Sequence, residues 1–391
     1  MSEHHHLSRR YLVIGGTAAI GSLVTARLAG AQDASPAAEE GGGMPPLPPG
    51  ATVAAEGLWN PGNLTFGPDG ALYIAESGVA GGGDGPGMMA TPMPDGALPP
   101  GAAPLVPPQV SMVAPDGTQM VLTTETGGIG IGFFNDSVFV STGGSSVGSG
   151  FAPLPEENRV TAVEIATAEV RTVAELGQFE VDNNPDGLDV NPNLYGLGIN
   201  SSGMIYVADA GGNSIYAVDS VSGEFSLFAV LPNLTELTGA TPTAEESEMQ
   251  PGPRQPVPTS VVVDGADHVT VVLLSEAWNG PSVFTYAPDG TYVVGSAVLS
   301  MIVSAALGPD GLLYVSQLTA DFSSEMPAPG NVLRINADAT VEPVVEGLFF
   351  PHGIAFDANG NLFVATNSII SGPDAPLGMV LRFDGIATPA A

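Results

Sequence analysis

The chain has 391 residues, a formal net charge of −33 and no cysteine. The negative charge excludes nucleic acid and anionic membranes as partners, because binding to either needs basic groups. The absence of cysteine excludes disulfides, a thiol nucleophile and cysteine-ligated zinc, whereas 44% apolar residues are enough for a packed core.

Residues 1–31 resemble a twin-arginine export signal. Arg9 and Arg10 precede a weakly apolar stretch at 14–26, and Ala29-Gly30-Ala31 offers a cleavage site between small residues. The stretch is too short to cross a bilayer comfortably, so we expect no membrane attachment after processing. We expect export to the periplasm, the cell surface or the medium. An ordinary signal or anchor with a chance arginine pair is the alternative.

Residues 32–50 are small, acidic and rich in proline and glycine. This composition is typical of a disordered linker. We expect one folded domain after it, at residues 51–386.

A repeated strand pattern occupies this domain. Segments 54–76 and 344–366 align without a gap, each with a short strand, a proline, a second strand, a tight turn and a third strand. Turns such as Pro68-Asp69-Gly70 favour reversal, because glycine readily adopts a positive φ. The weaker copies bring the total to six and lie at residues 130–141, 199–209, 261–274 and 307–316.

The arrangement of outer strands predicts an all-β, six-bladed β-propeller. Two further strands follow each of the first five copies, but the sixth has only one, at residues 378–383. A surplus strand at 52–56 precedes the first copy. We expect this N-terminal strand to pair beside 378–383 and complete the last blade, since closure removes exposed strand edges. An open array or two β-sandwiches would not explain the surplus strand.

The repeats resemble a known family. Residues 206–219 resemble the NHL repeat, in which a strand ends in Ala-Asp before a Gly/Asn turn. Residues 56–61 and 67–78, followed by a Gly-rich loop, are similar to the exported propellers of the ScyD/ScyE type. The resemblance covers residues 51–386. It implies the propeller fold and an exported location, and it implies no catalytic residue.

Oxygen-bearing side chains recur where the second strand of each copy ends. Propellers bind ligands at one end of the central channel, so these side chains predict a site for Ca²⁺ or another divalent cation. A channel lined by polar groups and water is the structural alternative. The candidate metal ligands are Glu76, Asp209, Glu276, Gln317 and Asn367.

Two histidines remain after processing, His268 and His352. His352 stands at the start of the sixth copy and would act as a base if it faced the channel. We expect it instead to cap a turn or to lie exposed, and we expect His268 to be exposed. The catalytic residues are therefore unknown, and no cofactor is assigned beyond the possible cation.

Two functions fit these observations. The first is an exported, monomeric, non-catalytic propeller that binds a protein, a glycan or a small molecule on one face. The alternative is a metal-dependent hydrolase or lyase, similar to the lactonases, in which a metal in the central channel polarises an ester carbonyl and activates water. Metal analysis and variants of Glu76 and Asp209 would separate the two.

Overall fold

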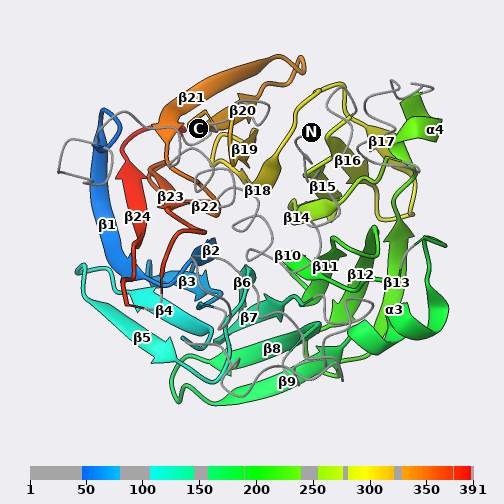
Figure 1. Ribbon diagram of the computed structural model, residues 1–391, viewed down its shortest axis with the longest axis horizontal. Coiled ribbons are helices and arrows are strands. Elements are labelled where there is room, and N and C mark those ends of the chain that lie inside the picture. Colours follow the sequence, from blue (N-terminus) through cyan, green and yellow to red (C-terminus); the bar gives the residue numbers. More distant parts are fainter. Residues whose placement is uncertain are drawn as a thin grey trace, which may run out of the picture.

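The computed structural model describes residues 46–79, 106–144, 157–188, 190–238, 254–275, 281–320, 328–372 and 374–388. The expected signal (1–31) and most of the expected linker (32–50) lie outside these residues. The described strands form six four-stranded antiparallel sheets around a central axis, which confirms the six-bladed β-propeller (Figure 1). None of the described helices has the length and apolar character needed to cross a membrane.

In the first five blades the strands run from the axis outward in chain order, and β22 is innermost in the sixth. Blades one and two consist of β2 (Pro61–Phe66), β3 (Leu72–Glu76), β4 (Gln109–Val113), β5 (Gln119–Thr123), and of β6 (Gly130–Phe134), β7 (Ser137–Thr142), β8 (Arg159–Glu164), β9 (Val170–Glu175). Blades three and four consist of β10 (Leu194–Ile199), β11 (Met204–Asp209), β12 (Ser214–Asp219), β13 (Phe225–Val230), and of β14 (Pro258–Val263), β15 (Val269–Leu273), β16 (Val283–Tyr286), β17 (Tyr292–Val294). Blade five consists of β18 (Ile302–Leu307), β19 (Leu313–Gln317), β20 (Gly330–Ile335) and β21 (Val341–Leu348).

The sixth blade is built from both ends of the chain. It contains β22 (Ile354–Phe356), β23 (Leu362–Thr366), β24 (Gly378–Phe383) and, outermost, β1 (Ala51–Leu58). β1 runs antiparallel to β24, with Thr52 opposite Arg382 and Glu56 opposite Met379 (Figure 1). The expected closure by the N-terminal strand is confirmed.

Two short helices lie in the connections between blades. α3 (Gly177–Asn183) joins blade two to blade three, and α4 (Leu234–Thr238) follows blade three. The strand pattern gave no indication of either helix.

The second strand of each blade forms the centre of the core. All five residues of β3 and of β23 are buried, because each strand packs between neighbouring blades on both of its faces. The turns that lead into these strands are held locally. In blade one, Asp69 Oδ1 accepts a hydrogen bond from the Ala71 amide, and Gly70 takes φ +84°.

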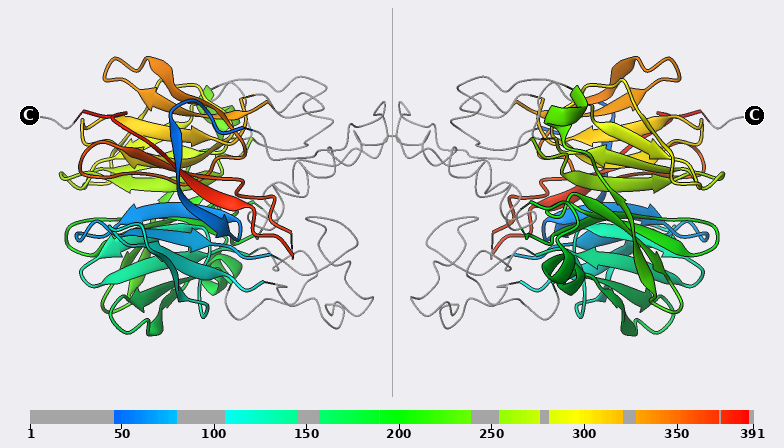
Figure 2. Two further views of the ribbon diagram at one scale, coloured as in Figure 1. Left: turned by 90° about the vertical axis from the view of Figure 1, so that its left-hand side faces the viewer. Right: turned by 90° about the vertical axis from the view of Figure 1, so that its right-hand side faces the viewer.

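The candidate site lies on one face of the propeller. Seen edge-on in Figure 2, the blades form a thick disc. The innermost strands begin, and the second strands end, on the same face of this disc, since Pro61 lies opposite Glu76 and Leu194 opposite Asp209. We call it the front face.

Candidate functional site

A buried cluster of apolar side chains lies at the front face. The side chains come from blades two to six, at the starts of the innermost strands and just after the ends of the second strands, and they form one buried cluster. We call this cluster the apolar plug; it consists of Ile129, Tyr195, Ala210, Val257, Leu274, Met301, Val303, Leu318, Phe350 and Ile369. Two of the oxygen-bearing positions predicted from the sequence, Asp209 and Gln317, directly precede plug residues in the chain.

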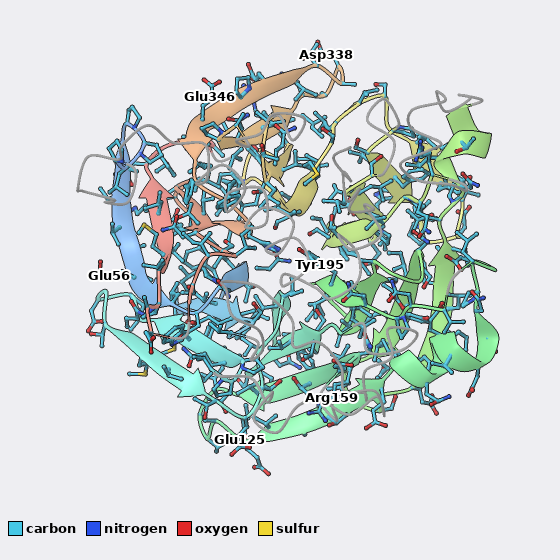
Figure 3. The ribbon with its side chains drawn as sticks, viewed as in Figure 1. Glu56, Glu125, Arg159, Tyr195, Asp338 and Glu346 are labelled. Carbon is cyan, nitrogen blue, oxygen red and sulfur yellow. The ribbon has the colours of Figure 1, made fainter. Side chains whose placement is uncertain are left out.

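Tyr195 and His352 meet across the ring. Tyr195 belongs to β10 in blade three, and His352 precedes β22 in the opposite blade. Tyr195 Oη and His352 Nε2 are 2.8 Å apart, and the two rings stack with their centroids 5.5 Å apart. Figure 3 shows Tyr195 near the centre of the ring. The pair links opposite walls of the channel.

His352 is 1% exposed, so the expectation that it caps a turn or lies exposed is wrong. The main chain beside His352 is closely packed, since a Cβ on Gly353 would lie 2.3 Å from Gly62 O. Burial lowers the pKa of the His352 imidazole to about 4, so the ring is neutral near pH 7. His268, in contrast, has a side chain that is 43% exposed and pairs with Asp264.

The innermost strands leave little space behind the plug. A Cβ on Gly196 in blade three would lie 2.5 Å from Thr259 O and 3.2 Å from Asn63 Nδ2, which belongs to blade one. Glycine is required at this position because the neighbouring main chain approaches so closely. The innermost strands of blades one, three and four therefore approach one another closely.

Glu76, the first predicted metal ligand, is fully buried in blade one. Its Oε1 accepts hydrogen bonds from Gln109 Nε2 at 2.9 Å and from the Ser111 hydroxyl, and its Oε2 accepts one from the Trp59 amide. Burial raises the pKa of Glu76, and these three hydrogen bonds oppose the rise. The carboxylate thus joins the second strand to the third strand and to the segment before β2.

Asp209 occupies the same position in blade three and is also fully buried. Its Oδ1 accepts hydrogen bonds from the amides of Asn193 at 2.8 Å and Gly212 at 2.9 Å. Its Oδ2 has no hydrogen-bond partner among the described residues. Burial raises the pKa of Asp209 to about 6, against the lowering effect of the main-chain amides. Asp209 therefore keeps one oxygen available.

The other predicted ligands lie in further blades. Gln317 Nε2 donates to Ser300 O at 3.0 Å, and Asn367 Nδ2 donates to Leu377 O at 2.8 Å. Glu276 lies outside the described residues. In the part of the chain that the structure describes, no three or more acidic or histidine side chains form a group that could hold a metal. A cation bound by the predicted ring stays a prediction.

Glu180, on α3, was not predicted from the sequence as a site residue. Its side chain is fully buried, and neither of its carboxylate oxygens has a hydrogen-bond partner in the described part of the chain. Burial raises the pKa of Glu180 to about 8, and the negative charges of Asp209 and Asp186 add to the rise. The available signal was the connection 176–188, which is longer than a tight turn and contains acids at 180, 182 and 186.

Comparisons with known proteins bear on the fold. No protein-family model and no curated protein sequence matches the chain. A solved structure from Agrobacterium tumefaciens described as the calcium-binding protein regucalcin is 12% identical, covers 86% of this chain and 95% of its own, and has a TM-score of 0.50. Virginiamycin B lyase from Staphylococcus aureus is 13% identical over 83% of this chain and 94% of its own, with a TM-score of 0.45. At 12% identity the likeness to the first structure supports the propeller fold alone, and the ScyD/ScyE resemblance stays a prediction.

Proposed function

We propose that this chain is an exported, non-catalytic β-propeller that binds a partner on one of its faces. The observation that carries the proposal is the contact between Tyr195 and His352 across the ring, beside the apolar plug. Side chains that pair with each other inside the ring favour recognition on the outer surfaces.

The positions of the acids support binding over hydrolysis. A metal-dependent hydrolase needs a metal with an open coordination position that substrate can reach. Glu76 uses both of its oxygens in hydrogen bonds to Gln109, Ser111 and the Trp59 amide. His352 is buried and neutral, and its Nε2 already pairs with Tyr195.

The charge restricts the partner. A net charge of −33 repels acidic surfaces and attracts basic ones, which favours a partner that is neutral or basic, such as a glycan, a small molecule or a basic protein. The resemblance of residues 1–31 to a twin-arginine signal supports a partner outside the cytoplasm. We propose that the propeller acts there as a monomer.

An activity screen tests the proposal. The purified chain is assayed on γ- and δ-lactones and aryl esters with added Ca²⁺, Mg²⁺ or Zn²⁺, and on a glycan array for binding. We expect no turnover above the buffer rate, and we expect binding that the His352→Gln variant retains. Turnover that the wild type shows and that His352→Gln or Glu76→Gln removes, while the exposed control Glu346→Gln keeps it, would overturn the proposal.

A further inference from the structure

A buried acidic pocket lies between α3 and blade three. Glu180 reaches it from the helix, and Asp209 and Tyr216 reach it from β11 and β12. All three side chains are fully buried. We call the space that they enclose, together with Gly212 and the nearby Asp186, the α3 pocket.

Gly212 shows that the two carboxylates face the same space. A Cβ placed on Gly212 would lie 2.9 Å from Glu180 Oε2 and 3.0 Å from Asp209 Oδ2. The two oxygens, which come from different elements, are therefore neighbours. Glycine at position 212 avoids the close contacts that any side chain would make with them.

Three oxygens in the pocket lack a partner. Among the described residues, neither Glu180 oxygen nor Asp209 Oδ2 makes a hydrogen bond. Tyr216 feels the same acids. Burial raises the pKa of its hydroxyl, and the negative charges of Asp209 and Glu180 add to the rise. Buried polar atoms are almost always paired, so several unpaired oxygens around one space point to a ligand that contacts them together.

The electrostatics favour a positive ligand. Two buried carboxylates lose hydration and repel each other, which makes their ionised forms unfavourable without a counter-charge. The charged groups acting on Glu180 in the described part of the chain are Asp209 and Asp186, and both are acidic. Asp186 is itself held by the Leu188 amide at 2.9 Å and by Asn213 Nδ2 at 2.7 Å. A single proton would satisfy only part of this oxygen-rich set.

We propose that the α3 pocket binds one Ca²⁺ ion, with Glu180 and Asp209 as its charged ligands. Ca²⁺ accepts six to eight oxygens in flexible geometry, so a bidentate Glu180, Asp209 Oδ2, water and main-chain oxygens suit it. No three described carboxylates lie close enough together to bind one metal ion, so the charged ligands are limited to two. Asp186 does not contact the ion and acts on it only through its negative charge. The ion fixes the connection between blades two and three onto blade three.

Calcium titration tests this inference. The full chain is stripped with EDTA, and Ca²⁺ binding is measured by calorimetry and by the shift in melting temperature. We expect one site per chain, with a rise of several degrees in the melting temperature on saturation. The Glu180→Gln variant removes a charged ligand and should weaken binding at least about tenfold. The Glu346→Gln variant, which removes one exposed acid from the rim of the propeller in Figure 3, should bind like the wild type.

A steric variant guards against failure of Glu180→Gln to fold. Gly212→Ala keeps every charge but places a methyl group within 3.0 Å of the Glu180 and Asp209 oxygens, so it should also weaken binding at least about tenfold. A wild type without a stoichiometric site would overturn the inference. So would binding by Glu180→Gln or Gly212→Ala as tight as that of the wild type. The inference is independent of the proposed binding role, because a structural Ca²⁺ site needs no partner on either face.

Discussion

Glu76 in blade one and Asp209 in blade three occupy the same position in the repeat, and both are fully buried at the end of a second strand. Their surroundings differ. Glu76 accepts hydrogen bonds from Gln109, Ser111 and the Trp59 amide, so neutral donors satisfy both of its oxygens. Asp209 leaves one oxygen facing a second acid, Glu180. The position in the repeat thus fixes where an acid lies, while its neighbours outside the repeat decide whether it stabilises the blade or needs a counter-ion.

Removing the Glu76 side chain should have the largest effect on stability. In Glu76→Leu the Trp59 amide, Gln109 Nε2 and the Ser111 hydroxyl lose their buried acceptor, and the free energy of unfolding should fall by about 3 kcal/mol or more. Urea unfolding measures the change. The exposed control Glu346→Leu should stay within about 0.5 kcal/mol of the wild type. A loss below about 1 kcal/mol in Glu76→Leu would mean that its donors find other acceptors.

A third buried group, His352, extends the comparison to pH. Its pKa is about 4 in the folded chain against 6.5 as the ordinary value, so the unfolded chain binds more protons between these pH values. The contribution of His352 to stability is therefore complete above pH 6.5 and is lost as pH falls toward 4. At 1.36 kcal/mol per pKa unit, the loss relative to His352→Gln is roughly 3 kcal/mol.

Unfolding curves in urea from pH 7.5 to pH 4, recorded for the wild type and for His352→Gln, measure this difference. The difference between the two proteins isolates His352, since the other titrating groups are common to both. Parallel pH profiles would show that His352 becomes protonated as readily in the folded chain as in the unfolded one.

The smallest effect should have the opposite sign. In EDTA above pH 8, where Glu180 with its pKa of about 8 is ionised, Glu180→Gln relieves the repulsion between Glu180, Asp209 and Asp186, so it should raise the free energy of unfolding by about 1 kcal/mol. Glu76→Gln, which weakens a satisfied network, should lower it under the same conditions. Denaturation in urea with EDTA present compares the two variants. A fall in both would remove the distinction between the two acids.

The fold could be predicted because its determinants are local and repeated. Pro68-Asp69-Gly70 and its counterparts specify tight turns, and the apolar runs beside them specify strands buried on both faces. The surplus strand at one end and the missing strand at the other then specified the closure that pairs β1 with β24.

The candidate site was harder to predict because it depends on side-chain direction and on contacts outside the repeat. Adjacent residues on a strand point to opposite sides, so a shift of one position separates the polar Asp209 from Ala210 in the apolar plug. Glu180 reaches Asp209 from a helix that has no counterpart among the repeats. In the alignment of segments 54–76 and 344–366, His352 matches Gly62. Because glycine has no side chain, the alignment does not show that the His352 side chain would be buried.

The pairing of β1 with β24 also has a kinetic consequence. The hydrogen bond between Thr52 Oγ1 and Arg382 O joins residues that are 330 positions apart. Contacts of such high sequence separation form late, because the chain between them must be ordered first. Of the described strands, β1 is the first in the chain and β24 is the last, so β1 can pair only after the strands between them have been synthesised. The ring therefore closes late in folding.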